Sequence, residues 1–541
     1  MVKNIYLNTS HHLFFSLEEG NSSSKFKMMC MYKKICSRKT EVGIEGIIMS
    51  KKKRNKENDI IVSFVGGSRD DVTGSATLIS YPTNEERKCI CLECGMIQGS
   101  MSPEIQYSTN KKLVENIPVE GISAVFVMHS HVDHTGNLSI FGREDYLGKV
   151  IMCKDTFEIC KDLLIDSEYL HSKEIEYLKS KGKRPKPLHT EVMLYNMFNK
   201  VETVEPHIEY TLDDYCKYEF YYSGHVVGGY QLKLTFTNPQ THRQTSVVYT
   251  SDLGSKHNLK YKPFVKPMDV IPKANMYIFE ATYGEGARCF DSTKVESERQ
   301  ELKRILENKL KNGHRVFFPS FSFGRTQELM HLIYNFFKDE EWFRKIPVII
   351  DGKLTNNICN TYSRVLKNED LDEWEEIKNW NNFVYNKEYA GTLAWLSKRE
   401  CGIYISSSGF IQPQTRSCDY VKNFMGCKND MIIFVGYAGG EGSIANALIN
   451  TPKGEPIKFD NTTLIKQCDV VSFSTFSSHI QQEEIFDYWR QINADKIIIH
   501  HASDEAKEEM KIKGQEYLMS KNKTIRIVTV GVHAFQFILN K

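Results

Sequence analysis

Short apolar runs that end in glycine-rich turns recur between residues 60 and 284. Apolar runs of this kind, bounded by turn residues, are typical of β-strands. A more helical and charged stretch over residues 155–199 interrupts the series. The pattern therefore predicts a sheet-rich domain, with strands at 60–65, 76–80, 89–94, 124–128, 218–223, 247–251 and 276–280.

The pattern changes after residue 284 to an alternation of helix and strand. The first predicted helix places the apolar side chains of Leu302, Ile305, Leu306 and Leu310 on one face. Alternating helices and strands are typical of the crossover units of a parallel sheet. We therefore expect a second, α/β domain with strands at 315–319, 348–351, 403–406 and 431–435. The chain then returns to strands at 470–473, 496–499 and 525–530.

The length of 541 residues is too great for one ordinary core, so we expect either two compact domains or one domain interrupted by another. The composition, 41% hydrophobic and 26% charged, is that of a globular protein. Residues 1–58 show no sustained helical or strand period and end in a run rich in lysine and arginine. We expect this segment to be a poorly structured basic tail.

Global charge does not select a partner for this chain. Its 70 basic and 68 acidic side chains give a net charge of +2, so a polyanion would have to bind a local positive groove. One candidate is a basic cluster that consists of Lys179, Lys181, Lys183, Arg184 and Lys186. Two interpretations stay open for it, a solvated loop and a contact to a phosphate backbone.

The cysteines indicate a reducing compartment. Fourteen cysteines without the dense spacing of small secreted domains are typical of free thiols, so we expect a cytoplasmic protein. Cys89, Cys91 and Cys94 contain one C-x-x-C spacing without a second, which favours buried thiols over a metal knuckle. No apolar run approaches the roughly 20 residues that span a bilayer, so membrane insertion is not expected.

One motif carries the chemistry of the chain. His129, His131, Asp133 and His134 form a His-x-His-x-Asp-His signature directly after an apolar strand. In an extended segment residues i and i+2 point the same way, so His129 and His131 can share one metal ion. The turn that follows directs Asp133 and His134 towards a second ion.

Imidazole and carboxylate ligands without thiolate suit zinc, and manganese and iron stay open as alternatives. Two such ions roughly 3.5 to 4 Å apart can generate a nucleophile at neutral pH and hold the two oxygens of a phosphodiester displacement. The signature therefore predicts a site for two Zn²⁺ ions, with Mn²⁺ as a rival, and a hydrolytic reaction.

From about residue 60 onwards the motifs resemble the metallo-beta-lactamase superfamily and, within it, the RNA-processing branch of the beta-CASP nucleases. The resemblance implies a four-layer αββα sandwich over 59–284 and 470–541, with a parallel-sheet α/β beta-CASP domain inserted over 285–469. The first family motif, an Asp before Cys-Gly, is matched by Glu93 before Cys94 and Gly95. Glutamate replaces the usual aspartate, and we expect Glu93 to keep a supporting role.

Later motifs supply the remaining ligands by the same resemblance. His225, in a Ser-Gly-His motif, would complete the first metal site, and Asp252 would bridge both ions. His500 ends a predicted strand, as in the RNA-cutting branch, and would bind the second ion. Its neighbour His501 would point the other way on an extended chain, so we expect it to be structural.

The general acid of the family is a histidine, and the sequence offers two registers for its motif. In the preferred register His479 is this histidine, and Gln481 stands where Asp is common; in the other, Phe476 would replace the histidine. Glu280, in a motif similar to the acidic motif A, would orient the acid.

Glycine turns of the inserted domain resemble the phosphate-binding loops of the family. Arg325 and the free backbone N–H groups beside it, and the turn at Ser408 and Gly409, could hold a phosphate of RNA. Packed turns between domains are the equal alternative.

Together these features predict a zinc-dependent nuclease that hydrolyses single-stranded RNA. Asp133, His479 and Glu280 are the expected catalytic residues. A hydroxide shared by both metals would attack phosphorus, and His479 would protonate the leaving 3′ oxygen, so that the product carries a 5′ phosphate. A DNA nuclease, a non-catalytic scaffold of an RNA-processing complex and a small-ester hydrolase are the alternatives. A homodimer or membership of an RNA-processing complex is also open.

Overall fold

The computed structural model describes residues 59–67, 72–99, 101–286, 289–436, 439–440, 442–459, 462–530 and 536–538. The basic tail expected over residues 1–58 lies outside the described residues, and so do several loop residues of the glycine-rich turns.

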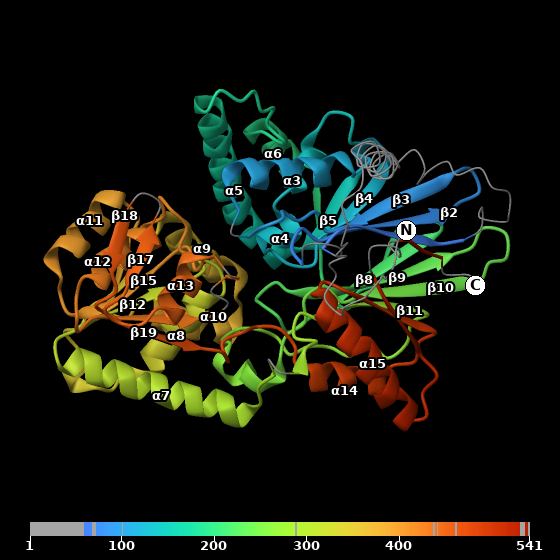
Figure 1. The fold of residues 1–541 in the computed structure, drawn as a ribbon. Coiled ribbons are helices and arrows are strands. Elements are labelled where there is room, and N and C mark those ends of the chain that lie inside the picture. Colours follow the sequence, from blue (N-terminus) through green and yellow to red (C-terminus); the bar gives the residue numbers. More distant parts are fainter. Residues whose placement is uncertain are drawn as a thin grey trace, which may run out of the picture. The chain divides into compact units, whose positions relative to one another are not determined.

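Two seven-stranded sheets form the larger part of the described chain (Figure 1). In spatial order the first sheet consists of β22 (Gln536–Ile538), β1 (Ile61–Gly66), β2 (Ala76–Pro82), β3 (Arg87–Leu92), β4 (Ile122–Phe126), β5 (Lys149–Cys153) and β6 (Val201–Val204). The second consists of β21 (Arg526–Thr529), β20 (Lys496–His500), β11 (Met276–Glu280), β10 (Gln244–Tyr249), β9 (Tyr230–Thr237), β8 (Cys216–Tyr222) and β7 (Tyr210–Asp213).

The two sheets pack face to face around a shared apolar core, to which Phe126 contributes from the first sheet and Ile278 from the second. Helices cover both outer faces (Figure 1). On the first sheet these are α3 (Pro103–Glu115), α5 (Lys154–Ser180) and α6 (Glu191–Phe198); on the second they are α14 (Gln482–Gln491) and α15 (Asp504–Ser520). The expected four-layer αββα sandwich is confirmed.

Short helical turns complete the connections of this sandwich and of the domain inserted into it. They are α4 (Val132–Thr135) and the 3₁₀ turns η2 (Val119–Gly121), η3 (Leu138–Gly142), η4 (Lys256–Tyr261) and η6 (Glu341–Phe343).

The inserted domain is built on a parallel six-stranded sheet, as the helix–strand alternation predicts. Its strands, in spatial order, are β14 (Phe383–Asn386), β13 (Val348–Asp351), β15 (Gly402–Ser406), β12 (Arg315–Pro319), β16 (Met431–Val435) and β19 (Asp469–Phe473). Its helices are α7 (Ser292–Lys311), α8 (Arg325–Phe337), α9 (Lys353–Val365), α10 (Asn368–Lys378), α11 (Tyr389–Lys398), α12 (Arg416–Met425) and α13 (Ile444–Asn450), with a hairpin of β17 (Pro456–Phe459) and β18 (Thr462–Ile465).

Burial on both faces explains why the strands of this sheet read as continuous apolar runs. All five residues of β12 and of β16 are buried. The predicted apolar face of α7 packs onto the sheet through Leu302, Leu306 and Leu310, while Ile305 is only partly buried.

The inserted sheet extends further along the chain than we expected. The sequence boundary at residue 469 assigns residues 470–473 to the returning part of the sandwich, whereas β19 pairs in parallel with β16, Asp469 opposite Met431 and Phe473 opposite Val435. Apolar pattern alone does not tell which of two sheets a strand joins, because both sheets bury such strands.

The order of strands in the second sheet brings distant segments to one edge. β10, β11 and β20 are parallel, and Glu280 at the end of β11 pairs with His500 at the end of β20. In the first sheet β3 and β4 are also parallel. The loops that leave the carboxyl ends of parallel strands share one edge, where sites commonly form.

The cysteines and the polarity of the helices bear on two further expectations from the sequence. The described cysteines are free, and Cys91 and Cys94 are buried, as expected for structural thiols. Burial raises the pKa of the Cys89 thiol to about 12, which keeps it protonated. Among the described residues, every helix is too short or too polar to cross a bilayer.

Candidate metal centre

The signature residues leave β4 in a short extended segment and enter the one-turn helix α4. Backbone hydrogen bonds fix this segment against the residue before β2 and the turn after β3: Ser75 N donates to Asp133 O at 2.8 Å, and Cys94 N donates to His134 O at 2.9 Å. Gly95 allows the close approach, because a Cβ atom there would lie 1.6 Å from Asp133 O. The close packing against Asp133 therefore explains why position 95 is a glycine.

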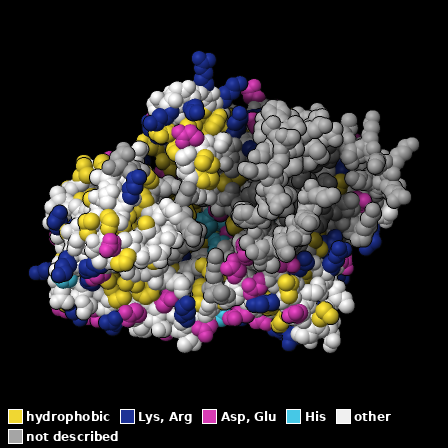
Figure 2. Space-filling view, in the orientation of Figure 1, with side chains coloured by type: hydrophobic (Ala, Val, Ile, Leu, Met, Phe, Trp, Pro, Cys, Tyr) yellow, Lys and Arg dark blue, Asp and Glu magenta, His cyan; other side chains and the backbone are white. Residues whose placement is uncertain are grey.

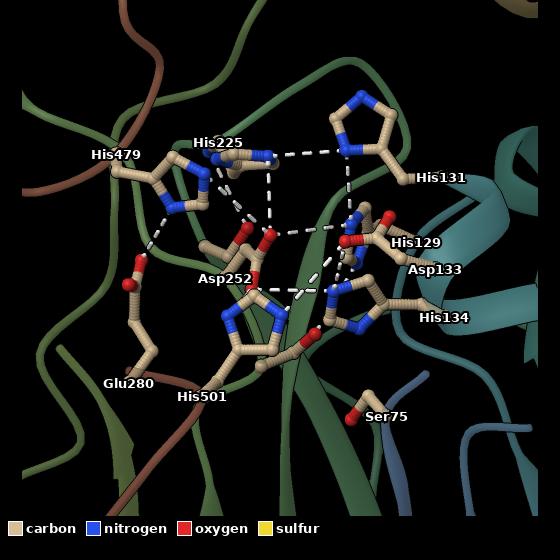
Figure 3. A network of polar contacts seen from close by, with 12 residues as sticks. Ser75, His129, His131, Asp133, His134, His225, Asp252, Glu280, His479 and His501 are labelled. Carbon is tan, nitrogen blue, oxygen red and sulfur yellow. Dashed lines mark hydrogen bonds and ion pairs between the residues drawn. The ribbon is translucent and has the colours of Figure 1, made fainter. Parts of the chain in front are cut away.

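A first group of donors consists of His129, His131, His225 and Asp252, whose ligand atoms lie within 4.8 Å of one another (Figure 3). His131 Nδ1 is 3.2 Å from His129 Nε2 and 3.3 Å from His225 Nε2. Asp252 Oδ2 lies 3.7 Å from His129 Nε2 and 3.6 Å from His225 Nε2. The sequence predicted this set, and the structure brings its members together.

A second group consists of Asp133, His134 and His501 (Figure 3). Asp252 faces this group with its other oxygen: Oδ1 is 3.4 Å from His134 Nε2 and 3.4 Å from His501 Nδ1. Asp133 Oδ2 lies 3.7 Å from His134 Nε2. Asp252 thus lies between the two groups, in the place of a bridging ligand.

The donors fit two metal ions. Burial holds the pKa of His129 and of His225 well below the usual value and that of His131 at about 4, so these rings are neutral and keep a lone pair for a cation. His134 Nε2 and Asp252 Oδ1 are buried, face each other and have no hydrogen-bond partner among the described residues. Buried polar atoms without partners are costly, and a cation between them would satisfy both. Nitrogen and oxygen donors without thiolate suit zinc.

Glu93 supports the second group from behind. Its buried carboxylate accepts hydrogen bonds from His134 Nδ1 at 2.6 Å, from Tyr249 Oη at 2.8 Å and from Ser251 Oγ at 2.5 Å. The first of these bonds fixes the imidazole so that Nε2 is directed at Asp252. A carboxylate behind a ligating histidine orients the ring and raises its basicity.

The structure places His501, and not His500, with Asp133 and His134. His500 is the last residue of β20; its Nε2 lies 3.5 Å from Ser75 Oγ, and its ring packs on Phe64 with 4.9 Å between centroids. The strand ends there, and His501 adopts a left-handed backbone with φ 50°. The alternation argument that directed His501 away from the site assumed an extended chain, which this turn interrupts.

His479 lies at the rim of the donor groups, between Glu280 and Asp252 (Figure 3). Its Nδ1 is 3.1 Å from Glu280 Oε1, and its Nε2 is 4.0 Å from Asp252 Oδ2. Glu280 is itself held by Leu253 N and Thr282 N, at 2.8 and 2.9 Å. Burial lowers the pKa of His479, but the carboxylates of Glu280 and Asp252 outweigh it, so that the pKa is raised.

The structure also decides between the two registers of the motif that would contain the general-acid histidine. Phe476 is fully buried, with the guanidinium of Arg299 3.3 Å from its ring centroid, whereas His479 faces the donors. Gln481 caps α14 and donates from Nε2 to His479 O at 2.9 Å. The amide therefore holds the backbone of the histidine, which a carboxylate cannot do by donating.

The expected phosphate contacts lie in the inserted domain. Arg325 begins α8, and its Nη1 pairs with Glu328 at 2.5 Å, so part of its charge is already neutralised. Phe323, two residues earlier, has its ring 5.5 Å from that of His131. Ser408 and Gly409 follow β15, and no hydrogen bond or ion pair between described residues joins either to the donor groups. A phosphate role for Arg325, Ser408 and Gly409 stays a prediction.

The model of the Beta-Casp domain family matches residues 326–448, which run from α8 to α13 in the inserted sheet domain. This part of the chain resembles a Beta-Casp domain. The resemblance to beta-CASP nucleases that the sequence motifs indicated is confirmed, and the matched residues lie within the domain inserted between β11 and β20.

Curated relatives match both the Beta-Casp domain and the sandwich around it. The Endoribonuclease YSH1 of Saccharomyces cerevisiae is 23% identical over 448 residues, which cover 81% of this chain and 54% of the yeast protein. Integrator complex subunit 11 of Gallus gallus is 24% identical over 86% of this chain and 73% of its own length. Transcription termination factor FttA of Methanosarcina mazei is 24% identical over 84% and 68%. The chain spans about half the length of the yeast relatives.

Sequence reasoning missed three contributors to the centre besides His501. Ser251 and Tyr249 donate to Glu93, and Ser75 Oγ lies 2.8 Å from Tyr249 Oη. Ser251 and Tyr249 precede Asp252 closely in the sequence, and alternation along β10 directs Tyr249 inward. No single-sequence signal distinguishes a hydroxyl that supports a ligand from one that satisfies a turn.

Proposed function

We propose that this protein is a zinc-dependent ribonuclease that hydrolyses phosphodiester bonds of single-stranded RNA and leaves a 5′ phosphate. The observation that carries the proposal is Asp252, whose two oxygens face two separate groups of neutral or paired imidazoles, with His479 beside them. A shared carboxylate between two donor groups is the arrangement that a two-metal hydrolase requires.

The residues of the chain divide the work of the reaction. His129, His131 and His225 would hold one zinc ion, Asp133, His134 and His501 the other, and Asp252 both. Bound zinc would supply a nucleophilic water at neutral pH and offset charge on the phosphate. The ligands lie in the connections that follow β4, β8, β10 and β20, including the short helix α4, so the sheets would hold both ions in fixed positions.

His479 is placed to act as the general acid. Glu280 holds Nδ1, so that Nε2 faces the donor groups and can give its proton to the leaving 3′ oxygen. The raised pKa of His479 favours the imidazolium, which is the state that donates. As a water oxygen bonds to phosphorus in line, the bond from phosphorus to the 3′ oxygen breaks and that oxygen takes the proton of Nε2, so the phosphate stays on the 5′ end of the downstream product.

The relatives favour RNA over DNA, since one of them is named an endoribonuclease. Another is named as a subunit of a complex, which favours a role within a complex. We extend to this chain the corresponding proposals that it acts on RNA and that it works within a homodimer or an RNA-processing complex. A cytoplasmic location is part of the same proposal and rests on the free cysteines.

The test uses purified protein with zinc or manganese, 5′-labelled single-stranded RNA and a matched DNA. We expect RNA cleavage that a chelator abolishes, and loss of cleavage by at least about 100-fold in Asp133→Ala and His479→Ala. Enzymatic end analysis of the downstream product should find a 5′ phosphate.

The controls separate the catalytic residues from general damage. Exposed His242 offers a matched variant, His242→Ala, which should cleave at the wild-type rate. Cleavage of DNA but not RNA would reassign the substrate. Folded, metal-loaded protein that cleaves neither polymer would overturn the enzyme proposal.

A further inference from the structure

The long helix α5 connects the metal centre to the basic cluster. At its start, Thr156 Oγ1 donates to Gly228 O at 2.8 Å, and Ser130 Oγ donates to Thr156 O at 3.0 Å. Ser130 lies between His129 and His131, so the start of the helix is fastened to the ligand loop. The helix then runs for 27 residues, which is about 40 Å, before it reaches the cluster.

The basic ridge, by which we mean Lys179, Lys181, Lys183, Arg184 and Lys186, is exposed and unbalanced. In Figure 2, Lys and Arg side chains (dark blue) gather at the top of the view, over the end of α5 and the loop after it. None of the five forms an ion pair with a described residue, and residues 179–190 contain no acid. Two other lysines of α5 are paired, Lys161 with Glu158 and Lys173 with Glu176. Glu104 of α3 faces Lys181 and Lys183 without forming an ion pair.

Buried contacts hold the loop of the basic ridge in place. Leu188 N donates to His171 Nε2 at 3.1 Å, and His189 pairs through Nδ1 with Glu168. Both histidines are buried, with their ring centroids 4.4 Å apart. Tyr107 Oη of α3 donates to Lys186 O at 2.7 Å. The cations therefore stand on a fixed backbone, which reduces the entropy lost when they bind a ligand.

Aromatic rings accompany the cations. Tyr177 is 37% exposed, and Lys181 Nζ lies 5.3 Å from its ring centroid. About two turns earlier in α5, Tyr169 is 58% exposed, with Lys173 Nζ 5.7 Å from its ring centroid. Exposed rings interleaved with cations are what surfaces for single-stranded nucleic acid combine, since bases stack while phosphates pair.

We propose that the basic ridge, with Tyr177, is a binding site for single-stranded RNA outside the metal centre. The proposal rests on the proposed function and deepens it, because an RNA that fills the centre and follows α5 would reach the ridge. At roughly 3.4 Å per stacked nucleotide, the 40 Å of α5 correspond to about 12 nucleotides. The ridge therefore gives the enzyme a preference for long substrates.

The experiment measures RNA binding by the full chain with a fluorescent single-stranded RNA of about 30 nucleotides, in chelator so that no cleavage occurs. The double variant Lys183→Glu/Arg184→Glu should bind at least about tenfold more weakly at low salt. Its plot of log affinity against log salt should lose about 1.4 units of slope, since each phosphate contact of a single strand contributes roughly 0.7. Tyr177→Ala should weaken binding, and Tyr177→Phe should restore it, because the ring and not the hydroxyl stacks.

The matched control variant replaces two lysines with glutamate elsewhere in the same domain, which reverses their charge. Lys511→Glu/Lys521→Glu carries the same change of charge on α15, where Lys521 also lies beside an exposed helix end and 5.5 Å from the ring of Tyr517. We expect this variant to keep the wild-type affinity and salt dependence. Equal losses in both double variants would show a global charge effect and would overturn the site.

Cleavage assays distinguish this proposal from the proposed function. With zinc, the ridge variant should lose much more kcat/KM on the long RNA than on an RNA of about 5 nucleotides, which is too short to span the helix. Tight, ridge-dependent RNA binding without any cleavage would contradict the proposed function and support the ridge. Cleavage with unchanged length dependence and unchanged affinity in the ridge variant would overturn the ridge alone, and so would a variant that lost binding only to an acidic peptide or an anionic vesicle.

Discussion

At the scale of single residues, two adjacent histidines have different surroundings. His500 packs on Phe64 at the end of β20, while His501 turns towards Asp252 and Asp133. We therefore expect folded His501→Ala to bind one zinc ion where the wild type binds two, and His500→Ala to bind both. Metal analysis of the purified variants measures this directly. A His500→Ala protein with one ion, beside a His501→Ala protein with two, would restore the ligand set expected from sequence.

Glu93 provides a second test at this scale. Its carboxylate accepts three hydrogen bonds in a fully buried place, one of them from the ring of His134. Glu93→Gln keeps the size but loses the charge behind the ligand, and should weaken zinc binding by about 10- to 100-fold. Competition with a coloured chelator measures the affinity. Glu202→Gln, which changes an exposed carboxylate paired with Lys149, is the matched control and should match the wild type.

These residues also show how far the sequence could predict the site. The sequence could predict four ligands, because a strand and a tight turn fix the directions of their side chains locally. These are His129, His131, Asp133 and His134. The choice between His500 and His501 depends on one left-handed residue after β20, and propensity does not predict such a backbone. The hydroxyls of Tyr249 and Ser251 depend on register between sheets, which single-sequence patterns do not contain.

At the scale of elements, the segment that carries His479 is held by its neighbours and not by its own secondary structure. Lys262, next to η4, donates from Nζ to Ser478 O at 2.8 Å, and Arg299 of α7 donates to Thr475 Oγ1 at 2.9 Å. Asn258 of η4 donates to Ser477 O. The acid is thus positioned from η4 on one side and from the first helix of the inserted domain on the other.

Lys262 makes the stability conferred by these contacts depend on pH. Burial lowers the pKa of its amine from 10.5 to about 7, against the opposing effect of Glu328. Between these two values the unfolded chain binds a proton that the folded chain does not, so stability rises with pH. Relative to Lys262→Met, the wild type should therefore gain as much as about 2 kcal/mol between pH 7 and pH 9.

Chemical denaturation of both proteins across this range measures the difference. The comparison removes the contribution of every other titrating group, provided that both proteins unfold in one transition. Lys260→Met, at the exposed neighbour of the same turn, serves as the control and should follow the wild type. A difference in the free energy of unfolding between wild type and Lys262→Met that stays constant with pH would show that burial does not lower the pKa of the Lys262 amine.

At the scale of the whole molecule, the sequence predicted the architecture better than the boundaries. The change from strand runs to helix–strand alternation located the inserted domain, because the period of apolar residues reports directly on the element. The pattern did not show that residues 469–473 complete the inserted sheet, since a buried strand looks alike in either sheet. Pairing is a property of the folded molecule and becomes visible only there.

Metal binding should stabilise the sandwich as a unit. Asp252 is buried and Asp133 is partly buried, and zinc would offset their two negative charges in the folded state only. Zinc at about 1,000 times its Kd contributes roughly 4 kcal/mol, so a chelator should lower the Tm by about 6 °C. Differential scanning calorimetry measures this shift. Asp252→Ala should melt at the same temperature with and without chelator, and a chelator effect of the same size in that variant would contradict the assignment.

The scattered origin of the donors has a consequence for synthesis. Asp133 and His134 leave the ribosome early, but His501 emerges only after the whole inserted domain has been translated, and β20 must still insert beside β11. A nascent chain consequently has no complete second donor group. For the proposed nuclease, this order of assembly would delay activity until the segment that follows the inserted domain has been translated.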